Sequence, residues 1–267
     1  MIRSVALAAD APPLSYDTNG TVSGDSTLVL LPGLFAGGWM WEPTWGALSA
    51  AGWPAMRLVD AISQLEESSD GVEALRGALL RTLAALPGGR FVLCGNSMGA
   101  LMALDFAATF PERVAAVVLS GAPGLDDDLN LGVGTPRVAT RDYMGQLATR
   151  LFHDTSCLTE EMLRRAEVLL SEKRHVRTIF RALKAARRYD VPGALARVTC
   201  PMLLVWGEHD NVTPRAKWAA LACELPDCTF VTVPACGHSP MVERPVEFNR
   251  ILLSFLEQRR TPWTSPV

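Results

Sequence analysis

Short, uniformly apolar runs alternate along the chain with longer segments in which apolar residues recur at every third or fourth position. A uniformly apolar run is typical of a strand that is covered on both faces of a sheet. A spacing of three to four is typical of an amphipathic helix. The predicted strands are 27–31, 55–59, 91–94, 114–119, 201–206 and 229–233. The predicted helices that accompany them are 39–51, 70–86, 97–110, 214–223 and 245–258.

Strands that alternate with helices predict right-handed β-α-β units and a mostly parallel sheet. The alternation stops between residues 125 and 189, where the pattern predicts helices and no strand. These predicted helices are 142–152, 159–171 and 175–188. The sequence therefore predicts an α/β fold whose core, residues 1–124 and 193–267, is interrupted by an all-helical insertion at 125–192.

Composition and charge narrow the range of partners. The chain has 267 residues, 49% of them hydrophobic, and a net charge of −3, which favours neither nucleic acid nor an anionic membrane as a partner. Its first residues lack the long apolar centre of a secretory signal, and no apolar stretch is long enough to span a bilayer. We therefore expect a cytoplasmic protein that acts on a small molecule. The oligomeric state is left open, with a homodimer as one alternative.

The six cysteines show no spacing typical of metal ligands or of a redox pair. Without an export signal we expect them to be reduced thiols. Cys223 and Cys228 flank a predicted turn, and a bridge between them is a minor alternative. We expect no metal and no cofactor.

A serine motif lies where a predicted strand ends and a helix begins. Residues 95–99 read Gly-Asn-Ser-Met-Gly and match G-x-S-x-G, the nucleophile elbow. The pentapeptide alone is weak evidence, because glycine and serine are common in turns. Its position between a strand and a helix favours Ser97 as an exposed nucleophile beside a helix N-terminus, where backbone N–H groups and the helix dipole stabilise negative charge.

A serine hydroxyl needs a base, and the chain offers four histidines. His238 lies in a loop after the last predicted strand, between a glycine and a nearby proline, and is the predicted base. The alternative interpretation is an ordinary surface histidine. His153 and His175 lie in the helical insertion and are interpreted as surface or packing residues, while His209 adjoins the predicted acid.

The base in turn needs a carboxylate that fixes its tautomer and stabilises the imidazolium. Asp210 follows the strand 201–206 and precedes His238, which favours it as the acid over a plain turn residue. Glu208 is a weaker candidate. The run Asp126-Asp127-Asp128, after the strand 114–119, is a third alternative and is interpreted as a solvated turn.

Acyl transfer also needs donors for the oxyanion that develops on the substrate. The N–H of Met98, directly after the nucleophile, is one predicted donor. The second is expected from the glycine-rich loop after the first strand, with Leu34 as the first choice and Phe35 as the reserve. The order nucleophile, acid, base along the chain is the order found in α/β-hydrolases.

On these motifs the chain resembles the α/β-hydrolase superfamily over nearly its whole length. The segments that carry the resemblance are LVLLPGLFAGGWMW, LCGNSMGALMALDFAATFPERVAAVVLSG, MLLVWGEHDNVTP and VPACGHSPMVERPVEFNRILLSFL. The resemblance implies that residues 125–192 form a helical lid, or cap, between core strands. It also implies the catalytic triad Ser97, Asp210 and His238.

Some segments are similar to the meta-cleavage-product hydrolases, which break carbon–carbon bonds in vinylogous 1,5-diketones. That similarity lies in GNSMG, in the CGH that EFN follows, and in LTEEMLRR of the insertion, and it implies that Arg164 or Arg165 contacts substrate. Three positions depart from that pattern: Pro32 stands where His is usual, Ala100 replaces a third glycine, and Ser239 replaces a tryptophan. These departures weaken the inference about substrate and leave the triad intact.

The predicted substrate cavity is mostly apolar. Its candidate lining residues are Phe35, Trp39, Leu125, Arg164, Arg165 and Met241. The sequence therefore predicts a serine hydrolase that cleaves a carboxylic ester, or a carbon–carbon bond next to a ketone, in a mostly apolar small molecule. Two alternatives remain: the same triad acting as a base in a lyase, elimination or cyclisation step, and a non-catalytic ligand receptor.

Overall fold

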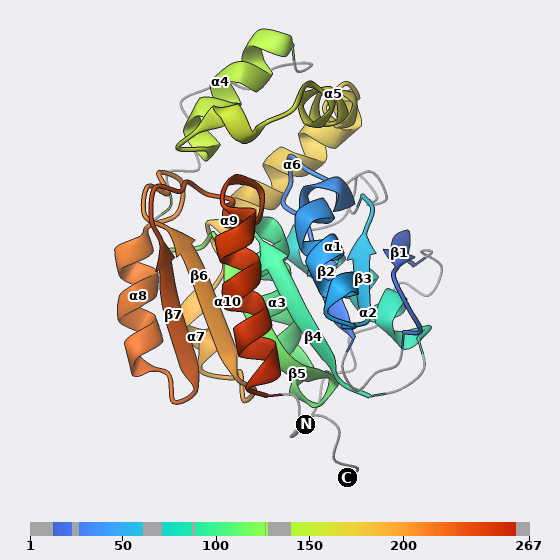
Figure 1. Ribbon diagram of the computed structural model, residues 1–267, viewed down its shortest axis with the longest axis vertical. Coiled ribbons are helices and arrows are strands. Elements are labelled where there is room, and N and C mark those ends of the chain that lie inside the picture. The colour runs from blue at the N-terminus through green and yellow to red at the C-terminus, as the bar shows by residue number, and fades with distance from the viewer. Residues whose placement is uncertain are drawn as a thin grey trace.

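The computed structural model describes residues 13–22, 27–60, 71–86, 89–125, 127 and 140–259. A seven-stranded sheet runs through the molecule in the order β1-β3-β2-β4-β5-β6-β7 (Figure 1). β1 pairs with β3 antiparallel, and all other neighbouring strands are parallel. The strands are β1 (Tyr16–Thr18), β2 (Leu28–Leu31), β3 (Ala55–Leu58), β4 (Phe91–Asn96), β5 (Val114–Ser120), β6 (Met202–Gly207) and β7 (Cys228–Val233).

The expected α/β architecture is confirmed, and each of the six predicted strands is present as one of β2 to β7. The additional strand β1 has three residues, all of them exposed. Because no residue of β1 is buried, its sequence contains no apolar run, and the apolar pattern does not predict this strand.

Helices cover both faces of the sheet. One face carries α2 (Gly71–Ala84), α3 (Met98–Thr109), α7 (Val191–Leu195) and α8 (Arg215–Glu224). The other face carries η1 (Gly38–Trp41), α1 (Glu42–Ala50), α9 (Pro240–Glu243) and α10 (Pro245–Glu257). The short helix η2 (Pro111–Arg113) links α3 to β5. The predicted helix 39–51 begins as the 3₁₀ turn η1, and α1 continues it.

Alternate residues of each central strand belong to different cores. Leu93 of β4 packs with α2 and α3, whereas its neighbours Val92 and Cys94 pack with α1 and α10. Because both sets of side chains are buried, the strands read as continuous apolar runs. This two-sided burial is the physical origin of the pattern seen in the sequence.

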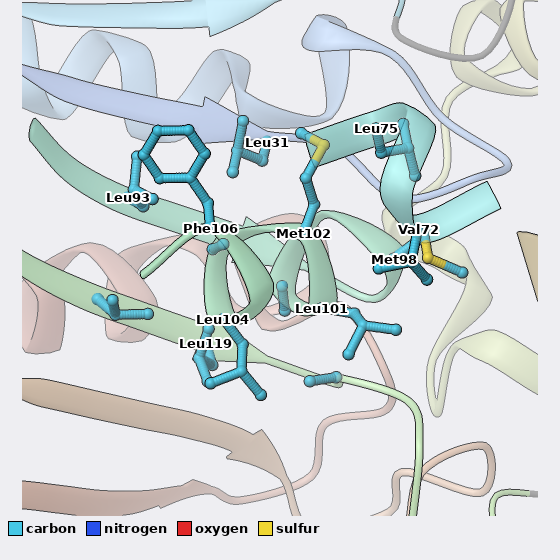
Figure 2. Close-up of a cluster of buried hydrophobic side chains, with 14 of the residues drawn as sticks. Leu31, Val72, Leu75, Leu93, Met98, Leu101, Met102, Leu104, Phe106 and Leu119 are labelled. Carbon is cyan, nitrogen blue, oxygen red and sulfur yellow. The ribbon is translucent and has the colours of Figure 1, made fainter. Parts of the chain in front are cut away.

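α3 lies in the middle of the first core. Every residue from Met98 to Ala108 is buried, so this helix is apolar all round. Figure 2 shows Leu101, Met102 and Phe106 of α3 among side chains from the strands and α2. The packing fixes the axis of α3, and therefore the position of its N-terminus next to Ser97.

Three longer helices follow one another between β5 and β6 and lie over one end of the sheet (Figure 1). They are α4 (Arg141–Leu151), α5 (Glu160–Leu169) and α6 (Lys173–Ala186), with the short turn η3 (Thr155–Cys157) between α4 and α5. Thr140 and Thr159 cap α4 and α5 by accepting hydrogen bonds from backbone N–H groups. α6 also packs against α2 and α3. The division of the chain into core and lid at residues 125 and 192 stays a prediction.

Two further observations concern possible membrane spans and the cysteines. Within the ranges described above, no helix is both long enough and apolar enough to cross a membrane. All six cysteines are free thiols, so the bridge between Cys223 and Cys228 considered above is not formed in the structure.

Candidate active site

Ser97 occupies the turn between β4 and α3. Its backbone has φ 56° and ψ −124°, in a region that residues with a side chain rarely adopt. The Ser97 N–H donates to the carbonyl oxygen of Ser120 at 2.8 Å, which ties the turn to the end of β5. The turn therefore holds the serine in a strained, partly exposed position at the carboxyl end of the sheet.

The two glycines of the motif are required by close backbone contacts. A Cβ at position 95 would lie 2.3 Å from the carbonyl oxygen of Gly99. A Cβ at position 99 would lie 2.2 Å from the carbonyl oxygen of Leu31 in β2. Neither site has room for a side chain, so the pentapeptide is explained by local packing around Ser97.

His238 and Asp210 form a buried pair at the same edge of the sheet. The Nδ1 atom of His238 lies 3.0 Å and 3.1 Å from the two carboxylate oxygens of Asp210. The side chains are 3% and 1% exposed, respectively. Asp210 follows β6 and His238 follows β7, so parallel pairing of these strands brings the two loops together. With Nδ1 engaged by the carboxylate, the tautomer that presents Nε2 as an acceptor is favoured.

Asp210 is held in its ionised form by several donors. Its carboxylate accepts hydrogen bonds from the backbone N–H groups of Val212 and Thr213, at 2.9 Å and 3.1 Å, and from the Thr213 hydroxyl at 2.6 Å. Burial alone would raise the pKa of Asp210. The charge of protonated His238 and the hydrogen bonds from His238 and Thr213 outweigh burial, so the pKa lies below its usual value.

The other candidate acids lie in different surroundings. Glu208 is about half exposed and accepts a hydrogen bond from the N–H of Ala235. Asp127 accepts hydrogen bonds from the N–H groups of Gly124 and Leu125, at 2.5 Å and 3.4 Å, in a tight turn after β5. Asp126 and Asp128 lie outside the described residues. Of the described carboxylates, Asp210 is the one that is hydrogen-bonded to His238. Asp127 is partly buried, and although burial raises its pKa, the charge of His238 acts in the opposite direction.

The three remaining histidines are placed as follows. His175 is buried in α6, and its Nδ1 lies 2.7 Å from the carbonyl oxygen of Leu169. His153, which follows α4, stacks on His209 beside the acid loop with ring centroids 4.1 Å apart. Only His238 among the four borders the cavity that Ser97 borders, as judged from its described lining residues.

The loop after β2 passes directly beside Ser97. A Cβ at position 33 would lie 3.2 Å from the Cβ of Ser97, so the glycine allows close approach. Leu34 and Met98 both border a small space of about 260 Å³. The N–H of Met98 belongs to the first turn of α3, where N–H groups have no acceptor within the helix. The two predicted oxyanion donors thus belong to neighbouring segments next to Ser97, the loop after β2 and the first turn of α3.

A larger cavity opens above Ser97 and His238. It encloses about 840 Å³ of space, part of it open to solvent, between the ends of the strands and the inserted helices. Its polar lining residues in the described chain are Asn96, Ser97, His238 and Ser239. Its apolar lining residues are Leu34, Phe35, Ala36, Trp39, Met40, Met144, Leu147, Ala148, Leu151, Phe152, Leu158, Met162, Leu163, Ala166, Leu183, Val212 and Val242. We call this space the apolar cavity.

Two of the predicted lining residues, Phe35 and Trp39, border the apolar cavity. Arg164 and Arg165 instead pair with Glu161 and border a second open cavity of about 930 Å³, which shares Trp39 with the apolar cavity. On α5 the apolar cavity is bordered by Met162, Leu163 and Ala166, so helical periodicity turns the two arginines to another side.

Met241 and Leu125 are the other two lining candidates. Met241 is fully buried in the second core, and the next residue, Val242, borders the apolar cavity in its place. Leu125 is partly buried and packs against the first core. The prediction for Met241 was therefore wrong by one position, because a buried residue and a cavity-lining residue follow each other in the chain. The prediction for Leu125 was wrong, because neither it nor its described neighbours are among the cavity-lining residues.

Two residues that the sequence reasoning missed support the His238 loop. The Asn96 amide donates to the carbonyl oxygen of His238 at 3.1 Å, and its oxygen accepts from the Ser239 hydroxyl at 3.1 Å. Gly121, with φ 59°, lies so close that a Cβ there would be 2.7 Å from Cε1 of His238. Asn96 occupies a position that the motif G-x-S-x-G leaves open and Gly121 follows β5, so no local pattern predicted either contact.

Comparisons with known proteins identify the family of the chain. A family model described as "Alpha/beta hydrolase family" matches residues 28–251. The chain is 30% identical, over 90% of both chains, to a 2-hydroxy-6-oxononadienedioate/2-hydroxy-6-oxononatrienedioate hydrolase from Paraburkholderia phymatum.

Two solved structures share the fold. A bacterial membrane phospholipase A matches with a TM-score of 0.80 at 24% identity, covering 93% of this chain and 85% of that one. A mutant of a meta-cleavage product hydrolase matches with a TM-score of 0.79 at 20% identity, covering 91% and 94%. Because the family model spans most of the sequence, the chain belongs to the alpha/beta hydrolase family and is an α/β-fold hydrolase.

Proposed function

We propose that this chain is a serine hydrolase that cleaves a carbonyl compound with an apolar acyl group. One observation carries the proposal: an imidazole fixed by a buried carboxylate at 3.0 Å borders the same cavity as a serine held in a strained turn. Ser97 is the nucleophile, His238 the general base, and Asp210 the group that orients and stabilises the base.

In the proposed reaction, Nε2 of His238 accepts the Ser97 proton while the serine oxygen attacks the carbonyl carbon. The N–H groups of Leu34 and Met98 donate to the resulting oxyanion. The protonated His238 then gives its proton to the leaving group as the acyl-enzyme forms. Water, deprotonated by His238, attacks the acyl-enzyme and releases the acid and free Ser97.

The lining of the apolar cavity supports a small, largely apolar substrate. Side chains from α4, α5 and α6 enclose the side opposite Ser97, so these helices act as a lid in this proposal. Burying an apolar acyl chain against them provides binding energy in proportion to the area removed from water. A carboxylic ester is the simplest substrate of this kind.

The activity named for similar proteins favours a second candidate reaction. The Paraburkholderia phymatum relative is named as a 2-hydroxy-6-oxononadienedioate/2-hydroxy-6-oxononatrienedioate hydrolase. For this chain, the corresponding reaction is hydrolysis of a carbon–carbon bond next to a ketone in a vinylogous 1,5-diketone. Cleavage of a carbon–carbon bond next to a ketone needs the same oxyanion donors, and water is again consumed. The base-only alternative, an elimination or cyclisation without an acyl-enzyme, uses His238 without a bond to Ser97.

The test is substitution of Ser97 by Ala combined with a substrate screen. Wild-type chain, S97A and the control S254A, an exposed serine of α10, are assayed with p-nitrophenyl esters and with vinylogous 1,5-diketones. S97A is expected to lose ester turnover by a factor on the order of 10⁴ or more, while S254A keeps it. Turnover retained by S97A would overturn the nucleophile assignment.

A fluorophosphonate probe separates the mechanisms further. Labelling of wild type but not of S97A, detected by mass spectrometry on the peptide that contains Ser97, supports an activated nucleophile. An acyl adduct trapped from a turned-over ester supports covalent catalysis. Product formation without any adduct at Ser97 favours the base-only reaction.

A further inference from the structure

Glu243, the last residue of α9, is a buried carboxylate outside the proposed triad. The residue as a whole is 4% exposed. The carboxylate accepts hydrogen bonds from three backbone N–H groups: Gly237 at 2.8 Å, Asp154 at 2.9 Å and His153 at 3.2 Å. A buried carboxylate is costly unless it is satisfied in this way, so the contacts are what allow it to be there.

The three donors belong to two segments that are far apart in the sequence. Gly237 precedes His238 in the loop after β7. His153 and Asp154 follow α4, in the inserted helices. One carboxylate therefore joins the loop of the proposed base to the segment between α4 and η3, within the inserted helices.

The two segments also touch directly. The His238 N–H donates to the carbonyl oxygen of Leu151, the last residue of α4, at 2.7 Å. A Cβ at position 237 would lie 2.7 Å from the nitrogen of His153 and 2.9 Å from Cα of Phe152. The segments thus pack backbone against backbone, and Glu243 closes the junction from one side.

We propose that Glu243 is a positioning residue that holds the His238 loop and the end of α4 as one unit. The inference rests on the proposed function, because it assigns Glu243 the task of keeping His238 aligned with Ser97. Leu151 and Phe152 border the apolar cavity, so the same junction also sets part of the cavity wall. Movement of the lid at this point is therefore coupled to the orientation of the base.

Both carboxylate oxygens are needed for this role. Oε2 accepts from Gly237 and His153, and Oε1 accepts from Asp154. Glutamine at 243 would place an NH₂ group against at least one backbone N–H donor, which leaves that donor unsatisfied and pushes the segments apart. Aspartate keeps both oxygens and the charge on a side chain that is one methylene shorter.

The experiment compares E243Q and E243D with the wild type and with E247Q. Glu247 is a matched control, since it lies four residues on, is partly exposed and pairs with Arg250 on the surface of α10. For each chain we would measure kcat, KM and the rate at which a fluorophosphonate labels Ser97. The thermal unfolding midpoint identifies a temperature at which every variant is folded.

The expected result for E243Q is a kcat lower by about 10- to 100-fold and an equally slower labelling rate, because a base displaced by a fraction of an ångström loses alignment. KM should change much less than kcat. E243D should recover part of the loss, and E247Q should match the wild type. A role confined to stability would lower the unfolding midpoint and leave kcat and labelling of the folded enzyme unchanged.

A folded E243Q with wild-type kcat and wild-type labelling would overturn the inference. If E243Q does not fold, E243D decides: reduced kcat and labelling support the inference, and unchanged values overturn it. The proposed function is judged separately by the wild type and S97A. If the wild type is not labelled at all, the proposed function fails and this inference falls with it.

Discussion

Asp210 illustrates how one buried charge is stabilised at the scale of a residue. Its side chain is almost fully buried, yet it accepts hydrogen bonds from His238, Val212 and Thr213. Thr213 is itself fixed, because its hydroxyl accepts from the indole N–H of Trp206 at 3.1 Å. Donors to Asp210, one of which is itself held by Trp206, thus keep the carboxylate in the geometry that orients the His238 imidazole.

Substitution of Asp210 by Asn tests this arrangement. The amide keeps the shape but removes the charge and favours the wrong histidine tautomer, so kcat for an ester should fall by a factor on the order of 10⁴. E208Q is the control, since Glu208 is half exposed and bonds to the loop at Ala235. If E208Q lost activity and D210N kept it, the acid would have to be reassigned.

The lowered pKa of Asp210 also predicts how stability depends on pH. Because the pKa in the folded state lies below the unfolded value of about 3.9, the ionised carboxylate stabilises the fold at every pH above that value. This contribution is lost as the pH falls through the folded pKa. The difference in unfolding free energy between wild type and D210N should therefore shrink below about pH 4. Urea unfolding of both chains from pH 3 to pH 7 measures it.

At the scale of elements, the turn that follows β5 limits the space around the His238 imidazole. Gly121 has φ 59°, and a Cβ there would lie 2.7 Å from Cε1 and 2.8 Å from Nδ1 of His238. Alanine at position 121 would both strain the backbone and displace the His238 ring. G121A should lower the unfolding free energy by about 1–3 kcal/mol and reduce kcat by about 100-fold.

Gly145 provides a matched control for that prediction. It lies on the exposed side of α4, and a Cβ there would meet no atom within 4 Å. G145A should raise the unfolding free energy by about 0.5–1 kcal/mol, because alanine is the better residue in a helix interior, and should leave kcat unchanged. Equal kcat values for G121A and G145A would contradict the role given to Gly121.

The elements that the sequence predicted are those whose signal is local. Two-sided burial makes β4 and β5 predictable as apolar runs. The elbow is predictable because its glycines and serine lie within five consecutive residues, although the contact that requires Gly99 is with the distant Leu31. The strand β1 was not predicted because its three residues are exposed, and α9 was not predicted because it is only one turn long. Predicted boundaries differ from the observed ones by a residue or two.

The missing parts of the site are contacts between distant segments. Asn96 reaches the carbonyl oxygen of His238, and Glu243 reaches His153, through pairings that no spacing in the sequence encodes. The arginines of α5 show a second limit. A motif located their helix, but the side of the helix that faces the cavity depends on how α5 packs in three dimensions.

At the scale of the whole molecule, the apolar cavity lies where two layers meet. The inserted helices lie over the carboxyl ends of the strands (Figure 1). Ser97 and His238 border the cavity on the strand side, and apolar side chains of the inserted helices border it on the other. In the proposed function, hydrolysis is carried out by residues at the ends of the strands and the substrate is selected by the inserted helices. Substitutions in α4 and α5 should change which acyl group is accepted, while the triad stays intact.

Charge discrimination between matched esters tests this division. Replacing the terminal methyl of p-nitrophenyl butyrate by a carboxylate gives the hemisuccinate ester, which would bury a charge among Leu147, Met162 and Leu163. A buried, unpaired carboxylate is unfavourable by several kcal/mol, so kcat/KM for the hemisuccinate should be lower by about 100-fold or more. The comparison requires only initial rates of p-nitrophenol release.

A cation placed in the lid should reverse part of that preference. Leu163 of α5 borders the apolar cavity and is partly exposed, so L163R can bring a guanidinium to the substrate without emptying the core. We expect kcat/KM to rise for the hemisuccinate and to fall for the butyrate, with labelling of Ser97 unchanged. Equal kcat/KM for the two esters in the wild type, or no change in their ratio in L163R, would show that the acyl group does not bind against these helices.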